Sequence, residues 1–260
     1  MSKLIHGDCI EEMAKMDANS VDLTVTSPPY DNLRAYEGSL QWNEDIWKQV
    51  LEGLYRVTKK GGVVAWVVGD ATIKGSETGT SFKQALYAME CGFNVETMIW
   101  EKTGSGCLGS NSYYGQNFEF VFIFAKGKPL HGGLIKDREN KRKSGKETVN
   151  GGIGKDGRGK YRTIYRKPYG KRTNIWRMNT QKNSEHPAPF PEQLAHDHII
   201  SWSNEGDIVF DPFLGSGTTG KMAKQLGRKF IGIEKVDKYY NIAKDRINET
   251  KEAEAVIEVD

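Results

Sequence analysis

Apolar residues along this chain form short β-branched and aromatic runs that alternate with longer stretches of helical spacing. The short runs predict buried strands at Val21–Thr26, Val63–Val68, Val95–Trp100, Phe118–Phe124, Ile208–Phe210 and Phe230–Ile233. The longer stretches predict helices at Glu44–Val57, Phe82–Glu90, Pro191–Ser201, Thr218–Leu226 and Val236–Ile247, the first two stopped by Gly61-Gly62 and by Gly92. Strands that alternate with helices favour an α/β fold with a mostly parallel sheet and helices on both faces.

Residues 131–172 interrupt this pattern. They show no hydrophobic periodicity and contain glycines throughout, so we expect an insertion or a long mobile loop there. The segment is also basic: Lys136–Arg172 holds 14 Lys and Arg against 4 Asp and Glu, in a chain whose net charge is only +3. Residues 1–130 and 173–260 would then form one domain around a positively charged insertion.

The composition is that of an ordinary globular protein. Hydrophobic residues make up 37% of the 260 residues, enough to fill a sizeable core. We find neither the apolar core of a signal peptide nor a membrane span of about 18 apolar residues. We therefore expect a cytoplasmic protein of a bacterium, archaeon or phage, with no membrane partner.

Cysteine and histidine patterns predict neither disulfides nor a metal site. Cys9, Cys91 and Cys107 are odd in number, widely spaced and without a C-x-x-C pair. His196 and His198 fall in a predicted helix, and the pattern supplies no third ligand.

A glycine-rich loop stands between a predicted strand and a predicted helix near the end of the chain. Its glycines, Gly215-x-Gly217-x-x-Gly220, fit the dinucleotide fingerprint and nearly fit a phosphate-binding loop. The phosphate loop requires Ser or Thr after its lysine to hold magnesium, and Met222 stands there. Glu234, at the end of the next strand, could bind the hydroxyls of a ribose. A nicotinamide cofactor and S-adenosylmethionine both carry such a ribose, and an empty tight turn has the same glycines, so the loop alone leaves the cofactor open.

The segment Ser27-Pro28-Pro29-Tyr30 follows the predicted strand Val21–Thr26, at the sheet edge where open α/β folds bind ligands. Proline fixes φ and carries no N–H, so the loop could present the Ser27 hydroxyl and the Pro28 carbonyl without pairing within itself. The exocyclic amino group of a base is a matching donor, and acceptors that hold it favour a more nucleophilic nitrogen. Tyr30 offers a flat face on which an extruded base could stack. The same residues also fit a polyproline-like turn with a buried tyrosine.

Together, Thr26-Ser27-Pro28-Pro29-Tyr30 and Asp211-Pro212-Phe213-Leu214-Gly215-Ser216-Gly217-Thr218-Thr219 give the chain a resemblance to a known family. It resembles the amino-methylating DNA methyltransferases of the permuted, beta-type order, in which the catalytic motif precedes the cofactor motif. The resemblance spans most of the chain outside residues 131–172. It implies a Rossmann-like, S-adenosylmethionine-dependent methyltransferase fold, with Ser27, Pro28, Pro29 and Tyr30 at the catalytic site.

The same resemblance implies a binding site for S-adenosyl-L-methionine. The segment Asp211–Gly217 would hold its methionine part, Glu234 its ribose and Asp8 its adenine, while His186–Pro191 would close over it. The residues implied are Asp8, Asp211, Pro212, Phe213, Gly215, Ser216, Gly217, Thr218, Glu234, His186 and Phe190.

The target base can be narrowed on mechanism. Related carbon-5 cytosine enzymes need the cysteine of a Pro-Cys pair, and none of the eight prolines here precedes a cysteine. Ser27 resembles the N4-cytosine group, whereas N6-adenine enzymes more often carry Asp or Asn there, whose side chains reach a purine amino group more easily. We expect methylation at N4 of cytosine, with N6 of adenine as the alternative.

The basic insertion is the expected target-recognition region, because its cations and tyrosines suit phosphate contacts and groove readout of double-stranded DNA. The residues expected to contact DNA are Lys141, Arg142, Lys143, Arg158, Lys160, Arg162, Arg166, Lys167, Lys171 and Arg172. A solvated disordered loop has the same composition. The sequence leaves open the recognition site, the choice between monomer and homodimer, and the presence of a cognate restriction endonuclease.

Three other functions share part of these motifs: an RNA methyltransferase, a protein-glutamine methyltransferase and an inactive nucleic-acid-binding protein. Intact residues at both motifs argue against the inactive fold. Protein-amide enzymes usually carry Asn where Ser27 stands, and they do not need a basic insertion.

Overall fold

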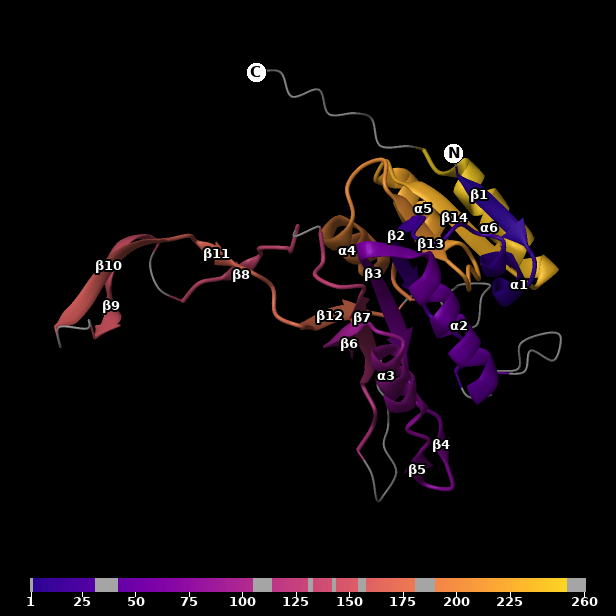
Figure 1. Cartoon of the computed structure of the whole chain (residues 1–260), viewed down its shortest axis with the longest axis horizontal. Helices are drawn as coiled ribbons and strands as arrows, with labels where there is room; N and C mark the ends of the chain where they lie inside the picture. Colours follow the sequence, from indigo (N-terminus) through magenta and orange to yellow (C-terminus); the bar gives the residue numbers. More distant parts are fainter. Residues whose placement is uncertain are drawn as a thin grey trace. The chain divides into compact units, whose positions relative to one another are not determined.

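The computed structural model describes residues 2–30, 42–104, 114–130, 133–141, 144–153, 158–180 and 190–251 (Figure 1). Contacts divide the chain into two compact units, Met1–Gly133 with Asn174–Asp260, and Leu134–Thr173. Within the described ranges, no helix is both long enough and apolar enough to cross a membrane.

The larger unit is built on an eight-stranded sheet with the order β1-β14-β13-β2-β3-β7-β6-β12. Its strands are β1 (Lys3–His6), β2 (Val21–Thr26), β3 (Thr58–Val68), β6 (Asn94–Thr103), β7 (Phe118–Ala125), β12 (Ile175–Asn179), β13 (Ile208–Asp211) and β14 (Lys229–Glu234). Its helices are α1 (Cys9–Ala14), α2 (Glu44–Val57), α3 (Thr80–Glu90), α4 (Glu192–Trp202), α5 (Thr218–Gln225) and α6 (Asp237–Glu249), and β4 (Thr72–Ile73) with β5 (Ser76–Glu77) forms a small hairpin. Among the sheet strands only β7 is antiparallel to its neighbours, so the predicted mostly parallel sheet is confirmed.

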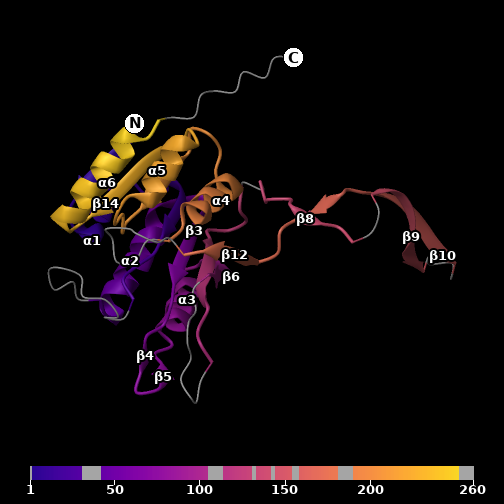
Figure 2. The same cartoon turned by 180° about the vertical axis from the view of Figure 1, so that it is seen from behind.

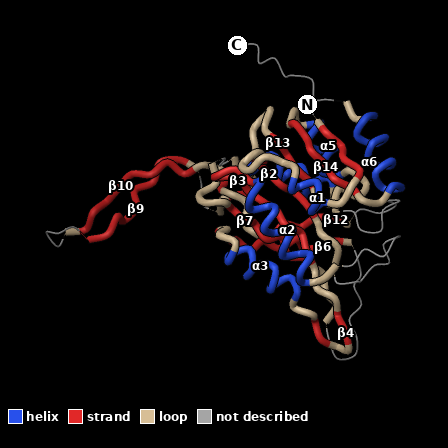
Figure 3. The backbone as a smooth tube through the Cα atoms, turned by 45° about the vertical axis from the view of Figure 1, so that its right-hand side comes forward, coloured by secondary structure: helices blue, strands red, loops and turns tan. Residues whose placement is uncertain are grey.

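Alternate residues of the strands face two layers of helices (Figures 2 and 3). On β14, Phe230 lies beside Gly220 of α5 and Ile247 of α6, whereas Ile231 and Ile233 pack in the core cluster under α1, α2 and α3. Consecutive helices contact one another within each layer, α1 with α2 and α2 with α3, then α4 with α5 and α5 with α6. The sheet is therefore covered on both faces, as the sequence predicts.

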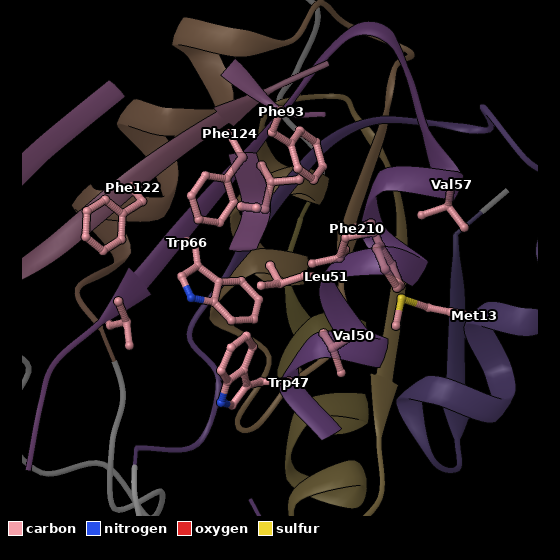
Figure 4. Close-up of a cluster of buried hydrophobic side chains, with 14 of the residues drawn as sticks. Met13, Trp47, Val50, Leu51, Val57, Trp66, Phe93, Phe122, Phe124 and Phe210 are labelled. Carbon is pink, nitrogen blue, oxygen red and sulfur yellow. The ribbon is translucent and has the colours of Figure 1, made fainter. Parts of the chain in front are cut away.

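Helix α2 shows how the apolar pattern builds the core (Figure 4). Trp47, Val50, Leu51 and Leu54 recur at helical spacing, and all four are buried in the central cluster with strand residues such as Trp66. The helix begins after Asn43, whose side chain accepts a hydrogen bond from the backbone N–H of Ile46 at 3.0 Å. A local cap and a local apolar stripe fix this helix, and its predicted bounds are confirmed.

The predicted end of α2 at the glycine pair is wrong. The helix ends at Val57 and β3 begins directly at Thr58, so Gly61 and Gly62 lie inside the strand. Val21 pairs with Thr58 but Leu23 pairs with Val63, which leaves a bulge in β3. The glycines serve this bulge: Gly61 has φ of +83°, and a Cβ on Gly62 would lie 2.8 Å from the carbonyl oxygen of Asp22.

Within the smaller unit, the expectation of a loop without secondary structure is wrong. Strands β9 (Gly145–Ile153) and β10 (Gly159–Arg166) form an antiparallel pair, and β8 (Arg138–Glu139) pairs with β11 (Tyr169–Gly170). Nearly every residue of β9 and β10 is exposed or half-buried. Because neither face of this ribbon is apolar, its strands leave no hydrophobic alternation in the sequence.

We expect Gly220→Ala to destabilise the larger unit even though alanine is the better helix former by about 1 kcal/mol. A Cβ there would lie 2.5 Å from Ile247 Cδ1 and 2.6 Å from Cε1 of the fully buried Phe230. Overpacking of this kind costs about 1–3 kcal/mol, which should appear as a lower Tm. In the control Gly159→Ala, the nearest neighbour of the new methyl is Tyr161 at 3.7 Å, so Tm should hold. An unchanged or higher Tm for Gly220→Ala would contradict this packing.

Candidate active site

The two motifs meet where the sheet changes its direction of growth. Strands β2 and β13 are parallel neighbours, with Leu23 opposite Val209 and Thr24 opposite Phe210. From β13 the chain continues to β14 on one side, and from β2 it continues to β3 on the other. Open α/β sheets bind ligands at such a switch point, beyond the carboxyl ends of the strands. Ser27 and Pro212 are the first residues beyond these two ends.

A buried hydrogen bond joins the motifs directly. The Thr26 hydroxyl donates to Asp211 Oδ1 at 2.6 Å, and the backbone N–H of Phe213 donates to the same oxygen at 3.0 Å. In return, the hydroxyl of Thr219 in α5 donates to the carbonyl of Val25 at 3.0 Å. Burial raises the pKa of Asp211 to about 7, despite its hydrogen bonds from Thr26 and Thr219. The carboxyl group is therefore held as a local structural anchor, away from water.

Glu234 fixes the glycine loop. Its Oε2 accepts from the N–H of Gly215 and its Oε1 from the N–H of Val236, each at 2.8 Å. Each carboxylate oxygen has a second lone pair, so both can still accept from another donor such as a ribose hydroxyl. Burial raises the pKa of Glu234. A carboxylate at the strand end, already tied to the loop backbone, fits the role expected for a nucleoside cofactor.

The loop also packs closely against the helix that follows β14. Gly217 has φ of +83°, and a Cβ there would lie 3.1 Å from Ala243 of α6. Arg246 of α6 donates to the carbonyl of Ser216 at 3.1 Å and to the hydroxyl of Thr218 at 3.2 Å. The same arginine pairs with Glu192, the first residue of α4. These contacts hold the turn rigid from the side of the helices.

Asp8 lies at the end of the neighbouring strand. It caps α1 by accepting from the N–H of Ile10 at 2.9 Å, and its other oxygen pairs with Lys235 Nζ at 3.1 Å. Because His6 is paired with Glu234, the ends of β1 and β14 are adjacent. The structure thus brings Asp8, Glu234, Asp211 and Ser27 to the same edge, after four adjacent parallel strands.

The hydroxyl of Tyr30 lies at the centre of a polar cluster. It is 3.0 Å from Ser27 Oγ, and it donates to Glu119 Oε2 at 2.8 Å. Lys102 Nζ binds the other oxygen, Glu119 Oε1, at 2.6 Å. The expectation that the loop makes no hydrogen bond within itself is therefore wrong, because its serine and tyrosine pair. Glu119 and Lys102 were missed, although a single acidic residue in the apolar run of β7 was a visible signal.

Other predicted residues lie elsewhere. Phe190 is buried, directly before Pro191, which caps α4 rather than beginning it. His196 bonds Asp197 at 2.9 Å while His198 stacks on Trp176. No group of three or more metal-ligating side chains occurs among the described residues.

The residues expected to contact DNA belong to the smaller unit, which the structure describes by itself. Arg166 pairs with Glu147, and Arg172 Nε donates to Asp137 at 2.8 Å. The other described members are Lys141, Arg158, Lys160, Arg162, Lys167 and Lys171. His186, Arg142 and Lys143 lie outside the described residues.

Comparison with known proteins agrees with this architecture. A family of N6 and N4 methyltransferases, described as DNA methylase, matches residues 21–245. The orphan methyltransferase M.BamHII of Bacillus amyloliquefaciens is 52% identical over 240 residues, covering 88% of this chain and 89% of that protein. The DNA adenine methyltransferase YhdJ of Escherichia coli K12 is 31% identical over 94% of this chain and 82% of its own length.

Among solved structures, the DNA modification methylase TTHA0409 of Thermus thermophilus, in complex with S-adenosyl-L-methionine, has a TM-score of 0.64 and 27% identity, covering 95% of each chain. The cytosine-N4-specific PvuII DNA methyltransferase has a TM-score of 0.69 at 20% identity, covering 94% of this chain and 86% of its own, and shares the fold. Fold and site are thus those of an S-adenosyl-L-methionine-dependent methyltransferase. More narrowly, the chain belongs to the N6/N4 DNA methylase family and is a DNA methyltransferase.

The raised pKa of Asp211 predicts a pH-dependent cost of folding. Its folded pKa is about 7 against a usual value of 3.8, so the folded state holds this proton to a higher pH than the unfolded chain does. The free energy of unfolding should therefore fall as pH rises from about 4 to about 7, by on the order of a few kcal/mol from this group.

Asp211→Asn keeps an acceptor for Thr26 and removes the titration. Urea unfolding at several pH values should show the variant gaining on the native enzyme as pH rises through this range. A stability difference that stays constant with pH would show that Asp211 does not titrate as described.

Proposed function

We propose that this enzyme methylates the exocyclic amino group of a base in double-stranded DNA, at N4 of cytosine. The hydrogen bond between Thr26 and Asp211 is the observation that carries the proposal, because it joins the serine loop to the glycine loop. The serine motif precedes the glycine motif in the chain, which supports the permuted, beta-type order.

The glycine loop and its neighbours would hold the cofactor. Glu234 would accept from the ribose, Asp8 would lie towards the adenine, and the segment Asp211–Thr218 would surround the methionine part. When bound, S-adenosyl-L-methionine supplies a methyl group on a positively charged sulfur. Its pocket wall is preformed, since the Gly215 N–H and the Glu234 carboxylate are already bonded to each other at 2.8 Å.

The serine loop would hold the base. Ser27 Oγ and the carbonyl of Pro28 would accept from the amino group, which localises the nitrogen lone pair and aims it at the methyl group. The ring of Tyr30 is half-buried, with its hydroxyl anchored on Glu119, so it has a fixed orientation for stacking on an extruded base.

The choice of cytosine rests on the length of the Ser27 side chain. A hydroxyl on a single carbon reaches less far than the carboxylate or amide that adenine enzymes commonly carry. N6 of adenine is the second candidate, because YhdJ, a relative at 31% identity, is named a DNA adenine methyltransferase.

The smaller unit would recognise the target. Successive side chains of β10 alternate between its two faces, so Tyr161 and Tyr165 share one face while Lys160, Arg162 and Arg166 share the other. Both tyrosines are largely exposed. A ribbon with exposed cations and exposed aromatic rings suits contacts to phosphates and to base edges.

Mass spectrometry of digested DNA tests the reaction. Expressed in a host without DNA methylation, the native enzyme should produce N4-methylcytosine, and Ser27→Ala should lower the yield by about 10²-fold or more. N6-methyladenine would overturn the base assignment but keep the amino-group chemistry. Native enzyme that leaves DNA unmodified would overturn the proposal.

Salt titration tests the recognition unit. Lys160, Arg162, Lys167 and Lys171 form no ion pair with the described part of the chain, so they are available to phosphates. Replacing all four with glutamine should weaken DNA binding and lower the slope of log K against log salt by up to about 3–4. The control replaces Lys74, Lys128, Lys229 and Lys244, lysines of the larger unit, and should leave the slope unchanged. Equal slopes for the two variants would place the DNA elsewhere.

A further inference from the structure

A buried carboxylate stands beside the serine loop with no assigned role. Glu119 belongs to β7 and is only 8% exposed. Trp100 of β6 is its cross-strand partner, and Lys102 lies two residues further on, so all three side chains share one face of the sheet. This register explains why Lys102 Nζ meets Glu119 Oε1 at 2.6 Å.

The pair is poorly explained by stability alone. A buried ion pair roughly balances its own desolvation cost, and apolar side chains often replace it without loss of stability. Its second oxygen, however, faces the catalytic loop and accepts from the Tyr30 hydroxyl at 2.8 Å. Val67 offers that hydroxyl only a weaker carbonyl acceptor, at 3.4 Å.

The number of protons then fixes a direction. Lysine only donates and a carboxylate only accepts, so the single hydroxyl proton of Tyr30 points to Glu119. The Tyr30 oxygen is left to accept, and Ser27 Oγ, 3.0 Å away, is its available donor. Once the Ser27 proton points to Tyr30, the outward side of Ser27 Oγ carries lone pairs only.

We propose that Glu119 and Lys102 are positioning residues that fix the direction of the hydrogen-bond chain Lys102–Glu119–Tyr30–Ser27, and so make Ser27 Oγ an acceptor for the amino group of the target base. The inference rests on the proposed function of the serine loop. It adds that the serine is useful only in one of its two hydrogen-bonding senses, and that a residue of another strand selects this sense.

Glu119→Gln reverses the chain without changing its shape. Beside the Lys102 ammonium the amide oxygen turns to the lysine, which leaves the amide NH₂ facing Tyr30. Tyr30 then donates to Ser27, and Ser27 presents a proton to the amino group. The expected result is a fall in kcat of about tenfold or more, with the KM for S-adenosyl-L-methionine and the KM for DNA within about twofold of native values.

The double variant Lys102→Met with Glu119→Gln separates direction from packing. Without the ammonium, the amide is free to turn its oxygen back to Tyr30, so kcat should recover to at least about threefold above that of Glu119→Gln. A merely structural pair predicts the opposite, because the double variant loses more contacts than the single one. Native kcat in Glu119→Gln, or a double variant no faster than the single one, would overturn the proposal.

A readout independent of turnover uses protein labelled with ¹³C at tyrosine Cζ. The Tyr30 resonance, assigned with Tyr30→Phe, should move in Glu119→Gln and return towards its native position in the double variant. The same spectra check that each variant is folded. If these shifts occur while native enzyme leaves DNA unmethylated, the direction of the chain holds and the proposed function fails. A methylating native enzyme whose Tyr30 resonance and kcat both ignore Glu119→Gln shows the reverse.

Discussion

The hydrogen bond from Thr26 to Asp211 holds the two halves of the active site together. The backbone pairing of β2 with β13 is short, with Leu23 opposite Val209 and Thr24 opposite Phe210, and both motifs begin just beyond it. The side-chain bond, with the bond from Thr219 to Val25, continues the contact past the end of the ladder. Residues separated by 185 positions in sequence therefore keep a fixed spacing where the cofactor and the base must meet.

Burial gives this bond its strength and also its cost. A carboxyl group shielded from water binds its donors strongly, but the same shielding disfavours its charge. The enzyme accepts a less stable fold near neutral pH in return for a rigid link between its two loops. Glu234 repeats the arrangement on the next strand, with a buried carboxylate that organises backbone N–H groups.

Local signals in the sequence predicted much of this structure. Helix α2 and strand β2 have the predicted bounds because a cap, an apolar stripe and a β-branched run are all local. The edge strand β12 escaped, because of its five residues only Trp176 is buried. Glu119 escaped for another reason: its role depends on β7 lying between β3 and β6, an arrangement that no local pattern encodes. The two motifs were predicted to share an edge, but the bonds between them were not.

The smaller unit begins and ends at one point. The N–H of Arg172 donates to the carbonyl of Ile135 at 2.8 Å, so the chain leaves and returns through neighbouring residues. The entropy of closing a loop grows only slowly with its length, by about 0.6 kcal/mol for each doubling. Everything between these two residues can therefore lengthen, shorten or be exchanged at little cost to the sheet. In evolutionary terms the segment is a replaceable module, and the sequence that the enzyme reads can change while its chemistry stays constant.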